Sequence, residues 1–164
     1  MAAPANAGFK PAYTLSGGPP AILYFPLVTA TAYKIGNVLR ISATSGSAAK
    51  QVAAGTAILG VAVRDVALTS ASVTKMPVWI ADGNTVFEAK KIVTGVPQNN
   101  VGDPADIVVG SVYNYRINTA ASTKVAKIVG YHPDEATTAH TGCRYYVMFE
   151  KSIFGNTARQ AGPG

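Results

Sequence analysis

Short apolar runs closed by Gly, Asn, Asp or Pro constrain the fold of this chain most, and they are clearest between Tyr33 and Lys90. There the segments YKIGNVLRIS, AGTAILGVAVRDV and KMPVWIADGNTVFEAK follow one another. β-Branched and aromatic residues dominate these runs, and such residues favour a pleated, partly buried surface. The pattern predicts an all-β fold, a compact β-barrel or β-sandwich with little helix.

Nine segments of this kind are spaced fairly evenly along the chain. The expected strands are Ile22–Phe25, Val38–Ile41, Ile58–Val66, Met76–Ile80, Val86–Ala89, Ile107–Val109, Val112–Ile117, Val125–Tyr131 and Tyr145–Phe149. The clearest hairpin is Pro77–Lys90, where Asp82-Gly83-Asn84 should reverse the chain. Two short segments, Ala48–Ala54 and Asp134–His140, are the candidates for helix.

The first 20 residues differ from the rest because they are rich in Ala, Gly and Pro. Proline lacks a backbone donor and restrains the residue before it, so we expect residues 1–20 to form an extended N-terminal arm rather than a helix or the interior of a sheet. Phe9, Tyr13 and Leu15 would anchor this arm on a partner; a disordered leader is the alternative. The β domain would then cover residues 21–155, with a flexible tail at 156–164. Deleting the arm should weaken partner binding and leave the β domain folded.

The composition indicates a domain that works through contacts with other proteins. The 164 residues suit one domain, and only 13% are charged, where about 25% is usual. Such a surface is easily desolvated, so we expect an oligomer or a larger partner. The formal net charge is +6, but the cations are scattered, which favours an acidic protein partner over nucleic acid.

Cysteine and apolar content bear on location. A single cysteine excludes an intrachain disulfide and suits a reducing compartment. The first residues lack the pattern of a signal peptide, and no apolar run reaches the roughly 18 residues of a membrane span. We therefore expect a chain that is made and used in a cytoplasm, without a membrane partner.

Two groups of side chains could in principle carry chemistry near the end of the chain. His132, Asp134, Glu135 and His140 are metal-competent, but their spacing matches no common zinc pattern, and a solvated loop explains them better. His140 also lies three residues from Cys143, yet a catalytic dyad needs a fixed hydrogen bond and an orienting third group. We expect Cys143 to be a semi-buried structural thiol.

The remaining candidates are acidic or aromatic. Asp103 and Asp106 could form a carboxylate pair, but Gly-Asp-Pro is first of all a turn sequence. Trp79 is expected to pack on a sheet rather than to stack on a ligand. We therefore predict no catalytic, cofactor or metal site, no small-molecule substrate, and no enzyme.

Three segments carry a resemblance to a known family: Lys34-Ile-Gly-Asn-Val-Leu, Gly55-Thr-Ala-Ile-Leu-Gly-Val-Ala-Val and Pro77-Val-Trp-Ile-Ala-Asp-Gly. With these the chain resembles the capsid decoration, or cement, proteins of tailed bacteriophages. The resemblance covers Ala21 to Lys91 and is looser through Phe149. Its motifs are patterns of strands and turns.

The resemblance implies a β-tulip-like protein that assembles, often as a homotrimer, on the outside of a phage head. It would bind where major capsid protein subunits meet and hold them together, so its location would be the virion. The alternative is a head-fibre or receptor-recognition module that holds glycans through Trp79 or through Tyr113 and Tyr115. A hydrolase built on Cys143 and a small barrel for single-stranded nucleic acid are further hypotheses.

Overall fold

The computed structural model describes residues 8–28, 31–42, 45–50, 57–67, 75–91, 97–109, 115–119, 123–135 and 142–154. These residues form eleven strands and one short 3₁₀ helix, η1 (Pro97–Asn100). The strands are β1 (Lys10–Thr14), β2 (Ile22–Pro26), β3 (Val38–Ile41), β4 (Ala48–Lys50), β5 (Ile58–Ala62), β6 (Lys75–Ile80), β7 (Thr85–Lys90), β8 (Pro104–Val109), β9 (Tyr115–Asn118), β10 (Ala126–Tyr131) and β11 (Arg144–Phe149). The all-β prediction is confirmed, and all nine predicted strands overlap an observed one. None of the described helices is long and apolar enough to cross a membrane.

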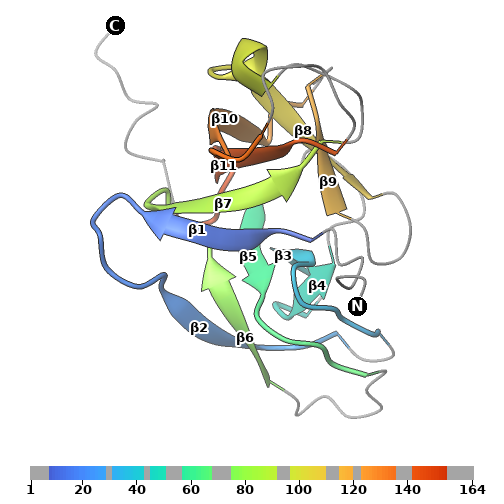
Figure 1. Ribbon diagram of the computed structural model, residues 1–164. Coiled ribbons are helices and arrows are strands. Elements are labelled where there is room, and N and C mark those ends of the chain that lie inside the picture. Colours follow the sequence, from blue (N-terminus) through green and yellow to red (C-terminus); the bar gives the residue numbers. More distant parts are fainter. Residues whose placement is uncertain are drawn as a thin grey trace, which may run out of the picture.

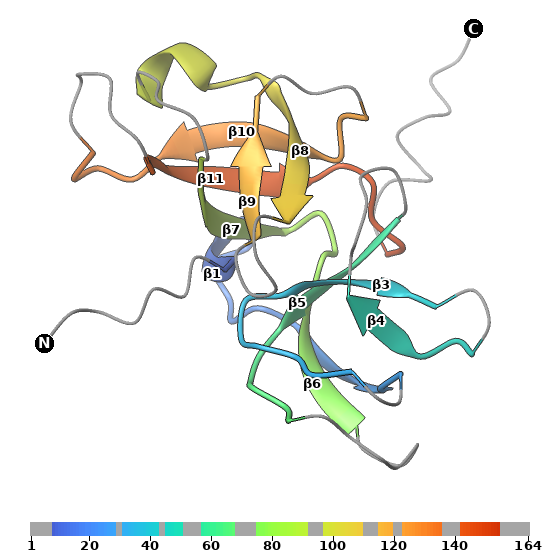
Figure 2. The same ribbon diagram turned by 90° about the vertical axis from the view of Figure 1, so that its right-hand side faces the viewer.

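The strands form two antiparallel sheets that lie one above the other in a sandwich-like arrangement (Figure 1). Sheet A has the order β1-β7-β11-β10-β8-β9, and sheet B has the order β2-β6-β5-β3-β4. Figure 2 shows the two sheets from the side, with sheet A above sheet B. Over the described ranges neither sheet closes into a barrel. Of the two predicted architectures, the sandwich is therefore the correct one.

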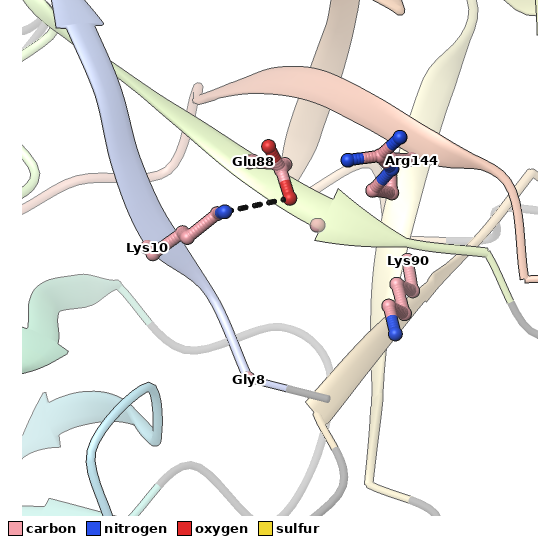
Figure 3. Close-up of a pocket in the computed structure, with 6 residues that line it drawn as sticks. Gly8, Lys10, Glu88, Lys90 and Arg144 are labelled. Atoms are coloured by element: carbon pink, nitrogen blue, oxygen red, sulfur yellow. Dashed lines mark ion pairs between the residues drawn. The ribbon is translucent and has the colours of Figure 1, made fainter. Parts of the chain in front are cut away.

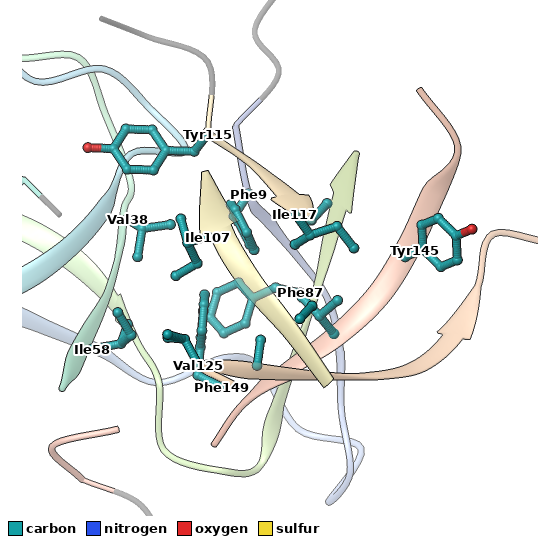
Figure 4. Close-up of a cluster of buried hydrophobic side chains, with 14 of the residues drawn as sticks. Phe9, Val38, Ile58, Phe87, Ile107, Tyr115, Ile117, Val125, Tyr145 and Phe149 are labelled. Atoms are coloured by element: carbon teal, nitrogen blue, oxygen red, sulfur yellow. The ribbon is translucent and has the colours of Figure 1, made fainter. Parts of the chain in front are cut away.

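Two hydrophobic clusters stabilise the sheets. The larger cluster joins sheet A to one face of sheet B and contains Phe9, Phe87, Ile117 and Phe149 (Figure 4). The smaller cluster lies on the other face of sheet B. Its buried members are Leu27, Tyr33, Leu39, Ala48, Leu59, Ala62, Met76, Val78 and Ile80.

Strand β5 is buried along its whole length because both of its faces are covered. Ile58 and Val61 belong to the larger cluster, whereas Leu59 and Ala62 belong to the smaller one. This explains why its sequence, ILGVA, is continuously apolar rather than alternating. Gly60 lies where a Cβ would overlap the carbonyl oxygen of Trp79 on β6, so the close approach of these two strands requires glycine.

The predicted hairpin at Pro77–Lys90 is wrong, although its turn is present. The carboxylate of Asp82 accepts hydrogen bonds from the backbone N–H groups of Asn84 and Thr85, both at 2.9 Å, and Gly83 has a φ of 73°. However, β6 pairs in sheet B and β7 pairs in sheet A. The turn therefore carries the chain from one sheet to the other instead of pairing the two strands.

The two predicted helices also differ from the structure. Ala48–Lys50 is strand β4, which pairs with Leu39–Ile41 of β3, because sheet hydrogen bonds outweigh the helix preference of an alanine-rich segment. Residues 51–54 lie outside the described residues. Asp134 and Glu135 are in a turn, and residues 136–140 also lie outside the described residues.

Candidate functional site

The N-terminal segment is part of the fold, which corrects the prediction of a separate arm. Residues Lys10–Thr14 are extended, as expected, but they form the edge strand β1 and pair with β7. Phe9 is 1% exposed and lies in the larger cluster, with its ring centroid 5.4 Å from that of Phe149. Its N–H also donates to the carbonyl of Gly36 at 3.0 Å. Phe9 therefore anchors the segment on its own domain and is not available to a partner.

The other two predicted anchors remain exposed. Leu15 is 62% exposed, and Tyr13 is 45% exposed. The ring of Tyr13 packs edge-on against Tyr146 of β11, with centroids 5.6 Å apart. The segment thus holds itself down through Phe9 and presents Tyr13 and Leu15 outward. Residues 1–7 and the predicted tail at 156–164 lie outside the described residues.

The acidic pair Asp103 and Asp106 does not form a joint site. Asp106 is buried and accepts hydrogen bonds from the hydroxyl of Thr123 at 2.6 Å and from its backbone N–H at 3.2 Å. Asp103 accepts from the side-chain amide of Asn100 at 3.0 Å. Each carboxylate therefore supports the loop beside it, in agreement with the turn interpretation.

Cys143 was expected to be a semi-buried structural thiol. Cys143 is completely buried, so it is more enclosed than the semi-buried thiol that we expected, and it is not disulfide-bonded. His140 lies outside the described residues. His132 Nδ1 is 3.5 Å from a carboxylate oxygen of Asp134. Among the described residues, no three His, Cys, Asp or Glu side chains converge as metal ligands would.

The aromatic residues considered for glycan binding are mostly inside the protein. Trp79 is half-buried and packs against the larger cluster, as the packing interpretation predicted. Tyr115 is 1% exposed, and this burial raises its pKa. Tyr113 lies outside the described residues. Trp79 and Tyr115 therefore do not offer a flat aromatic surface to a sugar.

A charged pocket of about 240 Å³ lies over β1, β7 and β11 (Figure 3). Lys10 and Glu88 face each other across β1 and β7 with an ion pair of 3.1 Å. Arg144 lies beside them, and its Nε donates to Glu135 at 2.7 Å, which raises the pKa of Arg144. The lining carries three cations, Lys10, Lys90 and Arg144, and one carboxylate, that of Glu88, so the pocket is positively charged.

The most unusual surface is strand β2, which forms one edge of sheet B. Ile22, Leu23 and Tyr24 are 44%, 48% and 66% exposed. Leu15, which precedes β2 in the chain, is also exposed. Neighbouring residues of a strand point to opposite faces, so β2 is apolar on both faces. We call Ile22–Tyr24 the apolar edge. Exposed apolar edge strands are unfavourable in an isolated protein, so this region is the candidate contact surface.

Strand β2 was predicted as a strand from its sequence but not as a candidate site. The run Ile-Leu-Tyr-Phe-Pro is as apolar as the buried strand β5. A strand without alternation usually indicates burial on both faces. Only the position at the edge of the sheet exposes it, and Pro26 at its end was the available signal, because proline is confined to edges and ends of sheets.

Known proteins give no independent indication of family. The chain matches no protein-family model and no curated protein.

Proposed function

We propose that the chain is a non-enzymatic structural protein that decorates the outer surface of a bacteriophage head. It would bind the major capsid protein as a homotrimer, stabilise the contacts between capsid subunits, and reside in the virion. It would need no cofactor, nucleic acid or small-molecule substrate. The sequence resemblance suggests this role, and the exposed apolar edge is the structural observation that supports it best.

The apolar edge could supply useful binding energy. Complete burial of a Leu or Ile side chain is worth about 1.5–3 kcal/mol, and each of these residues is already about half hidden. Covering Ile22, Leu23 and Tyr24 therefore contributes roughly 1 kcal/mol per residue. A ligand that binds only the assembled shell stabilises it by mass action. Three copies acting together would increase the effect through their effective concentration.

The glycan-binding alternative loses its principal support. Trp79 packs on the core and Tyr115 is buried, so these two residues cannot form the platform on which that hypothesis depended. We therefore keep the structural role as the proposal.

The proposal is tested by binding to bacteriophage heads assembled from the major capsid protein of a tailed phage. The substitution Leu23→Lys places a charge on the apolar edge and should weaken co-sedimentation with heads about tenfold or more, because desolvating an unpaired ammonium is costly. The matched control is Val129→Lys, since Val129 is exposed on β10 of sheet A. Equal binding of the two variants would contradict a role for this edge.

The oligomeric state can be tested separately. Light scattering should give three times the chain mass of 16.9 kDa. A monomer at the concentrations used for binding would remove the trimer from the proposal without affecting the apolar edge.

A further inference from the structure

Within the described part of the chain, the outer side of the β2 backbone has no strand partner between Ile22 and Tyr24. The N–H of Ile80 on β6 donates to the carbonyl of Ala21 at 3.0 Å, which sets the direction of the backbone groups. The direction of the backbone N–H and C=O groups alternates along an antiparallel strand. The backbone groups of Leu23 and Phe25 therefore also point toward β6. The N–H and C=O groups of Ile22 and Tyr24 therefore point away from the sheet.

A second contact confirms this direction. The N–H of Val28, two positions beyond Pro26, donates to the carbonyl of Ala48 on β4 at 3.2 Å. The even-numbered residues of this segment thus face outward, and at Val28 the outer side is already occupied. Between Ile22 and Tyr24, no described strand takes up these groups.

We propose that the capsid partner adds an extended segment to sheet B along β2. This inference rests on the proposed function and specifies its mode of binding. The backbone groups of Ile22 and Tyr24 would form up to four hydrogen bonds with the added strand. Strand addition of this kind obtains affinity from main-chain bonds and specificity from the alternate side chains.

The side chains of β2 define the chemistry of the added segment. Ile22 and Tyr24 project from one face of the edge and Leu23 from the other, and all three are exposed. A segment with apolar side chains on both faces would cover them, because cross-strand neighbours are the units that stabilise a sheet.

Positive charge near the Pro26 end of β2 adds a requirement for the partner segment. Lys75 of β6 is exposed and pairs with Pro26 of β2. The guanidinium of Arg64 donates a hydrogen bond to the carbonyl of Lys75 at 3.3 Å. Lys75 therefore places a cation beside this end of the edge, so we infer that the partner segment carries a carboxylate there. This agrees with the net charge of +6, which suits an acidic partner.

An added strand can pair with only a short part of β2. Pro26 has no N–H to donate, and Val28 is bonded to β4, so pairing cannot extend past Tyr24 in this direction. A limited edge of this kind prevents indefinite sheet growth while still accepting one strand.

The first test is hydrogen–deuterium exchange of the complete chain, free and bound to the same heads, read by mass spectrometry with backbone fragmentation. The amides of Ile22 and Tyr24 should exchange rapidly in the free protein and slow at least about tenfold on binding, since they gain hydrogen bonds. The amides of Leu23 and Phe25 should be protected in both states. Unchanged exchange at Ile22 and Tyr24 in the complex would overturn the proposal.

The second test uses matched substitutions. Tyr24→Val removes the ring but keeps the outward N–H, whereas Tyr24→Pro removes both. Proline is tolerated on an edge strand whose N–H faces solvent, so both variants should fold, as judged by their thermal midpoints. Losing one main-chain hydrogen bond should make Tyr24→Pro bind heads about fivefold more weakly than Tyr24→Val.

The outcomes separate the two proposals. Equal affinity of Tyr24→Val and Tyr24→Pro for heads, with Leu23→Lys still defective, would overturn strand addition and leave the structural role intact. If the unmodified protein does not bind heads, the structural role and strand addition both fail. Should Tyr24→Pro unfold, the exchange experiment on the unmodified protein decides the question.

Discussion

Replacing Phe9 by alanine should destabilise the whole domain, because the N-terminal segment is part of its core. Phe9 is 1% exposed and its ring lies 5.4 Å from that of Phe149, which in turn lies 5.2 Å from Phe87. The substitution would leave a cavity beside the rings of Phe149 and Phe87. Truncating a buried Phe to Ala typically costs about 3–5 kcal/mol.

This loss is large compared with the total stability of a domain, about 5–15 kcal/mol. With a urea dependence of about 2 kcal/mol per molar, the unfolding midpoint should fall by about 2 M. The backbone bond from Phe9 to Gly36 can persist in the variant, so the measured loss reports mainly on the side chain.

The measurement is equilibrium urea unfolding followed by tryptophan fluorescence, since Trp79 packs against the same cluster. Tyr13→Ala is the matched control on the same segment. Tyr13 is half exposed and has one edge-on aromatic contact, so its loss should cost only about 1–2 kcal/mol. If Phe9→Ala cost no more than Tyr13→Ala, our account of the segment as core would be refuted. If that were the result, deletion of residues 1–20 should also leave the stability of the domain unchanged. We expect instead that this deletion destabilises the domain severely.

Three further predictions concern stability. Gly60→Ala should lower the free energy of unfolding by at least about 3 kcal/mol, because a Cβ there overlaps the carbonyl of Trp79; Gly83→Ala, which meets no atom, should cost less in the same urea assay. Asp65 accepts hydrogen bonds from the Ile35 N–H and from Lys34, which lower its pKa; its stabilisation is present above the unfolded pKa of about 4 and is lost as the pH falls, so Asp65→Asn should reduce the acid dependence of the thermal midpoint. Burial raises the pKa of Tyr145 to about 12, so the folded chain keeps a proton that the unfolded chain loses above about pH 10; stability should fall between these values, and less steeply in Tyr145→Phe.

Local sequence patterns were sufficient to predict most strands but not their neighbours. Val38–Ile41 was predicted with its observed bounds because its apolar side chains and the turns around it lie within a few residues. The hairpin at Asp82–Asn84 was wrong because turn chemistry is local, whereas the choice of sheet depends on residues far away. Strand β4 was missed for the same reason, since its pairing with β3 outweighs the preference of its alanines.

The candidate site was even less accessible from the sequence. Tyr13 and Leu15 are exposed, and their contact with a partner stays a prediction. Phe9 looks equivalent in the sequence but is buried, because only the fold brings it to Phe149. The exposure of Ile22–Tyr24 follows from β2 being an edge strand, and strand order is a property of the complete sheet.

The order of strands in sheet A also bears on how the chain folds during synthesis. All five strands of sheet B lie between Ile22 and Lys75–Ile80, so that sheet can form while the chain is still growing. Sheet A cannot, because β11 lies between β7 and β10 and follows both in the sequence. Until β11 is made, the cover over the face of sheet B that carries Ile58 and Val61 lacks Tyr145, Val147 and Phe149. The domain can therefore complete its fold only after β11 has been synthesised. We expect the nascent chain to be most prone to aggregation just before that point.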